Sequence, residues 1–280
     1  MYKEFGISDE IIEIAEKSEK ELEPIFQKID ENCLKASARI LKAFQDHKVS
    51  GTDFIEVTGY GYYDGGREKL EQIYSQVLGA EDALVRPQIM SGTHALSLTL
   101  FGLLKYGDTM MSISGEPYDT LKSVIGIVGE SNNSLIQHGI HYEQIDLIND
   151  DFDIEKIVDR LKKSKVTLVE IQRSIGYSAR KSICIAKIEK VIQAIRKVDK
   201  DVIVMVDNCY GELVEDKEPT EVGADIIVGS LIKNLGGGIA TSRRIYSRKK
   251  RFSEKCCRKI NCTNDWEKYG SKFQSIIAVL

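Results

Sequence analysis

Short apolar runs rich in Val and Ile alternate with longer amphipathic stretches from about residue 84 to residue 228. Such runs are typical of strands buried in a sheet, and the amphipathic stretches are typical of helices. The pattern predicts strands over residues 84–85, 109–114, 142–147, 166–171, 202–206 and 224–228. It predicts helices over residues 91–104, 118–128, 154–161 and 185–198. Strands and helices that alternate in this way form βαβ units, so the expected fold class is α/β, with a mostly parallel sheet flanked by helices.

The N-terminal region has a helical pattern from Ser8 to about Gln45. Ser8 suits a helix N-cap and Pro24 suits the first turn of a helix, so we expect two helices, the second beginning at Pro24. The apolar residues expected to turn inward on the second helix are Ile25, Phe26, Ile29, Leu34, Ile40, Leu41 and Phe44. A loop rich in Gly and Tyr, residues 59–66, precedes a further helix expected over residues 68–78.

The composition is that of a globular protein. Of the 280 residues, 42% are hydrophobic, 29% are charged and only 4 are Pro, which excludes collagen, low-complexity disorder and a disulfide-dense secreted scaffold. No apolar run approaches the ~18 residues of a membrane span, and the first residues, MYKEFGISDE, lack the apolar core of a secretory signal. The 4 His and 6 Cys show no zinc or disulfide spacing. We therefore expect a cytoplasmic protein that binds no metal, membrane or nucleic acid.

Three strand ends carry residues that suit chemistry. Asp207 directly follows the apolar strand 202–206, Lys233 lies beyond the strand 224–228, and the segment 91–94 (Ser-Gly-Thr-His) opens a helix. Each feature also has an ordinary interpretation: an Asp that caps a turn, a lysine on a solvated loop, and a plain N-cap. In a parallel sheet, however, all three lie at the edge where ligands bind.

Taken together, these features predict a site for pyridoxal 5'-phosphate. An enzyme with this cofactor needs a lysine that bonds to it covalently, an acid beside its ring nitrogen and a phosphate cradle. Lys233, Asp207 and the helix start at Ser91 can supply these, because free N–H groups at a helix N-terminus favour a phosphate. Tyr118 is well placed to pack against the ring. The order of cradle, aromatic residue, acid and lysine along the chain is that of the fold-type I enzymes.

Four segments resemble the methionine gamma-lyase-like family, also called the aluminium-resistance proteins, which are relatives of the cystathionine lyases. They are GYGYYDGGREKLEQIY, GAEDALVRPQIMSGTHAL, IQRSIGYSARKS and VDNCYGELVEDKEPTEVGADIIVGSLIKNLGGGIA. They lie between about residues 55 and 240, and the last is the most distinctive. The resemblance implies a fold-type I transferase-like domain that depends on pyridoxal phosphate. It also implies cleavage of a C–S bond, by β- or γ-elimination, in a sulfur amino acid such as methionine or cystathionine.

The resemblance also assigns roles to residues around the cofactor. Lys233 would bind the cofactor and act as the catalytic base, Tyr118 would stack on its ring, and Asp207 would pair with the ring nitrogen. The residues that would hold the phosphate are Ser91, Gly92, Thr93 and Ser230.

Further contacts would come from two other regions. In related lyases a Tyr and an Arg of the neighbouring subunit reach the phosphate, and Tyr62 or Tyr63 with Arg67 would fill that role here. This implies a homo-oligomer, either a dimer or a tetramer. Gln172 and Arg173, at the end of the strand 166–171, would face the same crevice and contact the ring oxygen or the substrate.

The family-like pattern stops after Ala240. Residues 1–240 hold 28 Lys and Arg against 40 Asp and Glu, whereas the remaining residues hold 11 against 3. The sequence therefore predicts an N-terminal helical segment (1–54), a cofactor-binding large domain (55–240) and an atypical basic tail (241–280). One hypothesis is a shift of the coding frame after Ala240, so that the C-terminal small domain, which usually supplies an arginine for the substrate carboxylate, is missing. The alternative is a genuine basic tail.

Two alternatives to an active lyase stay open. The first is a catalytically inactive truncated remnant, or a non-enzymatic protein that binds pyridoxal phosphate, and a measurement of turnover distinguishes either from the lyase. The second is a module that binds polyanions through its basic tail. Such a module would lose that binding when residues 241–280 are removed.

Overall fold

The computed structural model describes residues 2–55, 64–86, 89–129, 133–234, 236 and 244–248. The helices are α1 (Asp9–Asp46), α2 (Gly65–Val77), α3 (Gly92–Leu103), α4 (Asp119–Ile125), α5 (Ile154–Lys163) and α6 (Ile185–Val198). The strands are β1 (Asp82–Arg86), β2 (Thr109–Ser112), β3 (His141–Gln144), β4 (Leu168–Gln172), β5 (Ile203–Asp207), β6 (Ile226–Ser230) and β7 (Arg244–Arg248). Short 3₁₀ turns occupy Tyr2–Phe5, Gly51–Phe54 and Pro219–Val222.

The strands form one sheet in the order β1-β7-β6-β5-β4-β2-β3. Each of the pairs β2–β3, β2–β4, β4–β5 and β5–β6 is parallel, whereas β7 is antiparallel to both of its neighbours, β1 and β6. The expected mostly parallel α/β sheet is confirmed. The sequence did not predict β7, which lies beyond Ala240. The proposed division of the chain at that residue stays a prediction.

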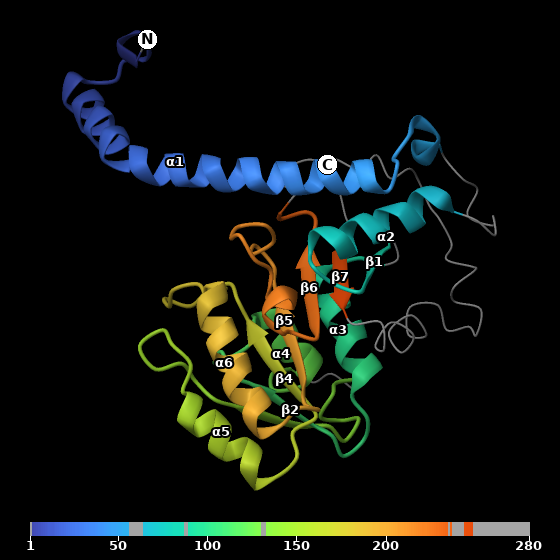
Figure 1. Cartoon of the computed structure of the whole chain (residues 1–280). Helices are drawn as coiled ribbons and strands as arrows, with labels where there is room; N and C mark the ends of the chain where they lie inside the picture. Colours follow the sequence, from blue (N-terminus) through green and yellow to red (C-terminus); the bar gives the residue numbers. More distant parts are fainter. Residues whose placement is uncertain are drawn as a thin grey trace.

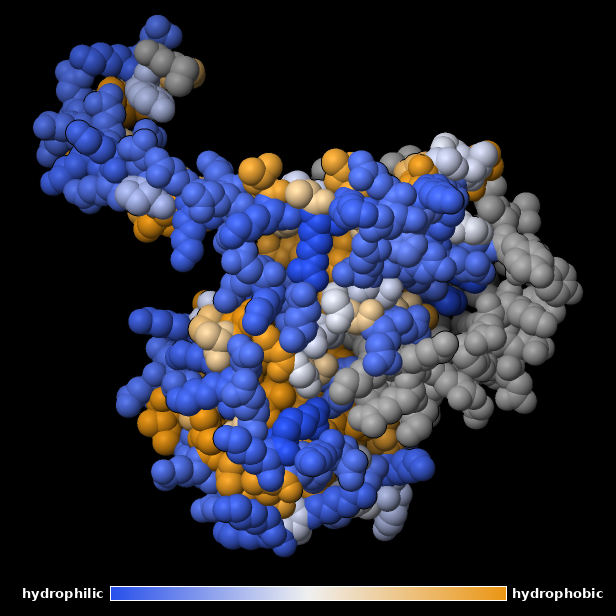
Figure 2. Space-filling model, in the orientation of Figure 1, coloured by the Kyte–Doolittle hydropathy of each residue, from blue (hydrophilic) through white to orange (hydrophobic). Residues whose placement is uncertain are grey.

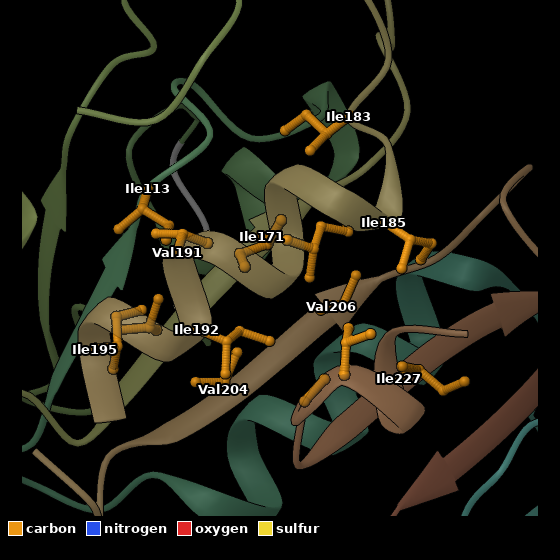
Figure 3. Close-up of a cluster of buried hydrophobic side chains, with 14 of the residues drawn as sticks. Ile113, Ile171, Ile183, Ile185, Val191, Ile192, Ile195, Val204, Val206 and Ile227 are labelled. Atoms are coloured by element: carbon orange, nitrogen blue, oxygen red, sulfur yellow. The ribbon is translucent and has the colours of Figure 1, made fainter. Parts of the chain in front are cut away.

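The two faces of the sheet carry separate apolar clusters. Along β5 the side chains alternate, so that Val204 and Val206 join one cluster while Ile203 and Met205 join the other. The first cluster packs against α6, whose Ile185, Val191, Ile192 and Ile195 lie over β4 and β5 (Figure 3). Residues of α3 and α4 cover the second cluster. The central strands are therefore buried on both faces, which accounts for their continuous apolar sequence.

The expected elements of the body are confirmed to within a few residues. The helix expected over residues 185–198 matches α6, and the strands expected over residues 202–206 and 224–228 correspond to β5 and β6. The strand expected over residues 142–147 ends earlier, since β3 stops at Gln144.

The expectation of two N-terminal helices is wrong. A single helix, α1, runs through Pro24. A proline inside a helix removes one backbone hydrogen bond and bends the helix without having to end it. Figure 1 shows α1 changing direction in its N-terminal part. The hydrogen bonds on either side of Pro24 are therefore sufficient to continue the helix.

The expectation that the apolar residues of α1 turn inward is correct only near its C-terminal end. There Ile40 and Phe44 pack with Ala43 against Ile73 and Val77 of α2. The other apolar residues expected to turn inward are exposed, and their exposed fractions run from 48% at Phe26 to 73% at Leu34. Between these two values lie Ile25, Ile29 and Leu41. The N-terminal part of α1 extends away from the α/β body (Figure 1), so none of the described helices and strands of that body covers it.

One face of α1 nevertheless repeats apolar residues at helical spacing. We name the α1 stripe the set Ile11, Ile14, Leu22, Ile25, Phe26 and Ile29, each of which is at least 41% exposed. Apolar patches are visible along this helix in Figure 2. Among the described residues, no helix has the length and apolar character needed to cross a membrane.

Candidate active site

A cavity of about 710 Å³ lies at the carboxyl ends of β4, β5 and β6. Seven of the residues predicted to face the cofactor line it: Ser91, Gly92, Thr93, Tyr118, Arg173, Asp207 and Lys233. They come from segments far apart in the sequence. The parallel sheet brings them together because the carboxyl ends of its strands meet along one edge.

The N-terminus of α3 forms one wall of the cavity. The Ser91 side chain caps the helix, with Oγ accepting a hydrogen bond from the N–H of His94 at 3.0 Å. The hydroxyl oxygens of Thr93 and Thr120 lie 2.5 Å apart, which links this helix to the start of α4. The first N–H groups of a helix have no intrahelical partner, and the helix dipole favours an anion there.

Asp207 is the last residue of β5, and only 5% of its surface is exposed. Its Oδ1 accepts a hydrogen bond from the N–H of Cys209 at 3.1 Å. Burial raises the pKa of this carboxyl, while hydrogen bonds from Cys209 and the nearby charge of Lys233 lower it. A buried carboxylate in such a place is stabilised by a cationic partner in the cavity.

Lys233 lies in the turn that follows β6. Its backbone N–H donates to the carbonyl of Ser230 at 2.9 Å. The Nζ atom lies 4.1 Å from the ring centroid of Tyr210 and 6.0 Å from that of Tyr118. The ammonium group therefore lies among aromatic rings, which attract a cation, at the wall of the cavity.

Tyr118 is fixed by contacts on two sides. Its backbone N–H donates to Oε1 of Gln172 at 2.7 Å. Its ring stacks on that of Tyr177, with centroids 5.6 Å apart and planes inclined by 23°. Tyr118 thus presents a fixed aromatic ring to the cavity, as predicted from the sequence.

Gln172 and Arg173 have mainly intramolecular partners. The Arg173 guanidinium donates to the carbonyl of Ile183 at 3.2 Å, to Oδ1 of Asn208 at 2.9 Å and to the carbonyl of Gly211 at 2.6 Å, and it pairs with Glu215. The Gln172 side chain binds the N–H of Tyr118 and the carbonyl of Ser174. Both residues hold the loops of the site in place, and their contact with a cofactor or substrate stays a prediction.

Ser230 and Arg67 do not line this cavity. Ser230 is fully buried at the end of β6, and its N–H donates to Oε1 of Glu212 at 2.6 Å. Arg67 is buried on α2, where its N–H donates to Oδ1 of Asp64 at 3.1 Å. Their roles toward a phosphate stay predictions, that of Arg67 across a subunit interface. Tyr62 and Tyr63 lie outside the described residues.

The sequence analysis missed two residues near Lys233. Tyr210 adopts a left-handed backbone conformation, with φ of 69°, and places its ring over Lys233. Glu212 is buried, and besides Ser230 it engages Asn234, whose Nδ2 donates to the Glu212 carbonyl at 3.1 Å. Glu212 therefore holds the turn on both sides of Lys233. The run Asn-Cys-Tyr-Gly-Glu after a strand was the available signal, but it marked only a turn.

A glycine makes room for Glu212. A Cβ on Gly229 would lie 2.6 Å from Oε1 of Glu212, so any larger residue at position 229 would displace the carboxyl. Burial raises the pKa of Glu212 to about 8. The carboxyl is thus closely packed beneath the turn that carries the lysine.

The model of the methionine gamma-lyase family matches residues 11–279 of the chain. The chain belongs to the methionine gamma-lyase family. The match continues past Ala240 into the segment that the sequence analysis set apart as a tail.

Three relatives show how far the similarity extends. YnbB of Bacillus subtilis, an uncharacterized protein, is 41% identical over 260 residues, which are 92% of this chain and 62% of YnbB. A crystal structure from Clostridium acetobutylicum is 42% identical with a TM-score of 0.92, over 97% of this chain and 65% of that chain. The carbon-sulfur lyase involved in aluminum resistance from Clostridium novyi is 41% identical with a TM-score of 0.91, again over 97% and 65%.

These similarities confirm the predicted fold class, that of the fold-type I pyridoxal phosphate enzymes. The chain spans less than two thirds of the length of each of these relatives. What the complete relatives do is therefore a matter for proposal in this chain.

Proposed function

We propose that this chain binds pyridoxal phosphate and cleaves the C–S bond of a sulfur-containing amino acid. The observation that carries the proposal is the placement of Asp207 and Lys233 in one cavity, with the N-terminus of α3 and Tyr118 on its walls. The family of the chain, and the name of its Clostridium novyi relative as a carbon-sulfur lyase, support the same chemistry.

The residues of the cavity fit this cofactor. The buried carboxyl of Asp207 suits a protonated ring nitrogen, because a cation beside it would offset the cost of its burial. Ser91, Gly92 and Thr93 open a helix toward the cavity and suit a phosphate. Tyr118 provides a flat apolar face, and Lys233 provides the amine that bonds to the cofactor.

When bound, the cofactor would supply an electron sink for the substrate carbanion. Asp207 would keep the ring nitrogen protonated. Lys233 would hold the cofactor covalently before substrate binds, and its freed Nζ amine would take the proton from the substrate Cα. In a β-elimination the electron pair left at Cα would form a double bond to Cβ, and the sulfur would leave with the electron pair of the broken C–S bond and take up the proton that Lys233 Nζ can return. For a C–S bond at Cγ, Lys233 would also take a proton from Cβ before the sulfur leaves.

Methionine and cystathionine are the proposed substrates, and the cytoplasm is the proposed location.

We also propose that the protein is a homo-oligomer in which a second copy covers the α1 stripe. The stripe has six large apolar side chains on one helical face, and all are exposed in the single chain. Contact between such a surface and water is unfavourable. An apolar surface such as the same stripe on a second copy can pack against these side chains, whereas a charged or polar surface would not.

The visible spectrum of the purified chain with added pyridoxal phosphate tests the cofactor site. We expect an absorbance band that borohydride abolishes and that Lys233→Ala lacks, while Lys181→Ala, at an exposed lysine outside the cavity, retains it. The absence of this band in a folded protein would overturn the proposal. A band without release of thiol from methionine or cystathionine would mean that the chain binds the cofactor but is not a lyase.

A further inference from the structure

The loop between β2 and α4 carries Tyr118 into the cavity, and residues of the adjacent strand β4 form hydrogen bonds with this loop. The backbone N–H of Gln172 donates to Oγ of Ser114 at 2.8 Å, and the Gln172 side chain accepts from the N–H of Tyr118. Two residues earlier on the same strand, Glu170 binds Ser112 at the end of β2. Side chains at positions 170 and 172 share one face of the sheet, so both reach the same loop.

Glu170 is completely buried and lacks the partners that a carboxylate requires. Its Oε2 lies 2.8 Å from Oγ of Ser112, and its Oε1 has no hydrogen-bond partner within the part of the chain that the structure describes. A buried ionised carboxylate with a single hydrogen bond is strongly disfavoured, whereas a neutral carboxyl tolerates the same surroundings far better.

The hydroxyl of Ser112 has two oxygens within hydrogen-bond distance but only one proton to donate. Its Oγ is 2.8 Å from the carbonyl oxygen of Gly115 and 2.8 Å from Oε2 of Glu170. A serine hydroxyl has one proton, and a carbonyl oxygen can only accept. If Ser112 donates to Gly115, the contact with Glu170 is a hydrogen bond only when Glu170 donates.

We propose that Glu170 is a positioning residue that stays protonated at neutral pH and, through Ser112, holds the loop that presents Tyr118 to the cavity. The relay runs from the Glu170 carboxyl to the Ser112 hydroxyl and on to the Gly115 carbonyl. Gly115 has a positive φ of 88° and turns the chain toward Tyr118. Only the contact of Tyr118 with the cofactor rests on the proposed function.

The groups around Glu170 act in opposite directions, and burial is the largest of their effects. The charge of Asp207 on β5 favours a neutral carboxyl, whereas the charge of Arg180 in the loop after β4 and the hydrogen bond with Ser112 favour the ionised form. Tyr142 on β3 donates its own proton to Gln144. Burial is the largest cause of the rise of the Glu170 pKa to about 8, with Asp207 contributing. A neutral Glu170 adds no second negative charge beside Asp207.

The pH dependence of stability tests whether Glu170 is protonated. Above its ordinary pKa of 4.5 the unfolded chain releases this proton while the folded chain keeps it up to about pH 8. The free energy of unfolding should therefore fall with rising pH in the wild type more than in Glu170→Gln, up to about pH 8. Glu189→Gln, at a partly exposed glutamate on α6, should follow the wild type. Parallel curves for wild type and Glu170→Gln between pH 5 and 9 would overturn the proposal.

Amide hydrogen exchange in the chain without cofactor tests the relay. We expect Glu170→Ala and Ser112→Ala to speed exchange in residues 113–118 by about tenfold, the effect of one lost hydrogen bond. Glu170→Gln, whose amide N–H₂ can still donate to Ser112, should restore slow exchange. Unchanged exchange in Glu170→Ala, or equal acceleration in Glu170→Gln, would exclude the relay.

A cofactor titration separates this proposal from the proposed function. If the wild type binds pyridoxal phosphate, Glu170→Ala should weaken binding by about tenfold and Glu170→Gln should largely restore it. If the wild type binds none, the proposed function fails, while the stability and exchange measurements still decide the state and role of Glu170.

Discussion

The α/β body and the N-terminal part of α1 both carry regularly spaced apolar residues, but among the described residues only those of the body are covered by the same chain. Ile188 and Ile192 of α6 are buried against the sheet, whereas Ile25 and Ile29 of α1 are more than half exposed. The comparison shows that an apolar stripe predicts that a surface will be covered and does not say by what. In the body the covering element is a neighbouring strand or helix of the chain, and for α1 we propose a second copy.

The largest expected effect concerns the site that the body builds. Asp207→Asn keeps the size of the side chain but removes the charge that would hold the ring nitrogen protonated. We expect C–S cleavage to fall by about 10²- to 10⁴-fold, the usual worth of a placed proton-transfer group, while the protein remains folded. Thiol release from methionine or cystathionine measures this. Activity within a factor of ten of the wild type would mean that Asp207 does not serve the reaction.

A matched pair of truncations compares the two regions directly. Ile188→Ala removes a fully buried side chain and should lower the free energy of unfolding by about 2–5 kcal/mol. Leu34→Ala, on the exposed and solvated side of α1, should change it by less than about 0.5 kcal/mol. Denaturant unfolding of the two variants measures the difference. Equal losses would show that α1 is as closely packed as the body.

A substitution at β6 tests the packing beneath Lys233. Gly229→Ala places a Cβ 2.6 Å from Oε1 of Glu212, and such overpacking of a buried site costs about 1–3 kcal/mol. Because Glu212 holds the turn around Lys233, the variant should also bind pyridoxal phosphate more weakly. Gly51→Ala is a suitable comparison, since it shares the glycine loss, has open space around it and does not need a left-handed backbone. A fully stable Gly229→Ala protein with normal cofactor binding would contradict this account.

The smallest effect on the fold should come from the α1 stripe. Ile25→Glu with Ile29→Glu places two charges on its centre and should convert the oligomer to a smaller species, with little change in secondary structure. Analytical ultracentrifugation of the wild type and the double variant measures the assembly. Glu16→Gln with Glu19→Gln, at exposed glutamates of the same helix, is the control. A wild-type protein that sediments as a monomer would exclude the proposed second copy.

The acidic residues beneath the site add a pH dependence that is shared by the body. Burial raises the pKa of Glu212 to about 8 and that of Glu218 to about 7. Each keeps its proton in the folded chain at pH values where the unfolded chain has lost it, so stability should fall as the pH rises from about 4.5 toward 8. Glu212→Gln should reduce this slope, and denaturant titrations at several pH values measure it.

Much of the body could be predicted from the sequence because its signals are local. The apolar run at residues 202–206 has the pattern of a buried strand and forms β5. The stretch at residues 185–198 has the apolar period of a helix and forms α6. Asp207 and Lys233 were found because they follow such strands, and a parallel sheet places the carboxyl ends of its strands together. The residues that line the cavity were thus predictable in kind and largely in position.

The sequence predictions failed where the role of a residue depends on its contacts with residues distant in the sequence. Pro24 is compatible both with the start of a helix and with a bent interior, and only the continuing hydrogen bonds around it decide between them. Glu212 and Glu170 look like ordinary surface acids in the sequence, since nothing local shows that Gly229 or Ser112 will lie against them. Arg173 lines the cavity as expected, but the sequence could not show that its guanidinium also binds loop carbonyls from positions remote in the sequence.

The sequence by itself determined the alternation of elements, the parallel sheet and the set of residues at its carboxyl edge. It could do so because the period of apolar residues and the order of motifs are properties of the chain alone. The tertiary structure decided which side chains are buried without a full set of partners and which apolar surface stays open. Burial, and with it the protonation of Glu170 and the exposure of the α1 stripe, depends on contacts between distant segments, and these exist only once the chain has folded.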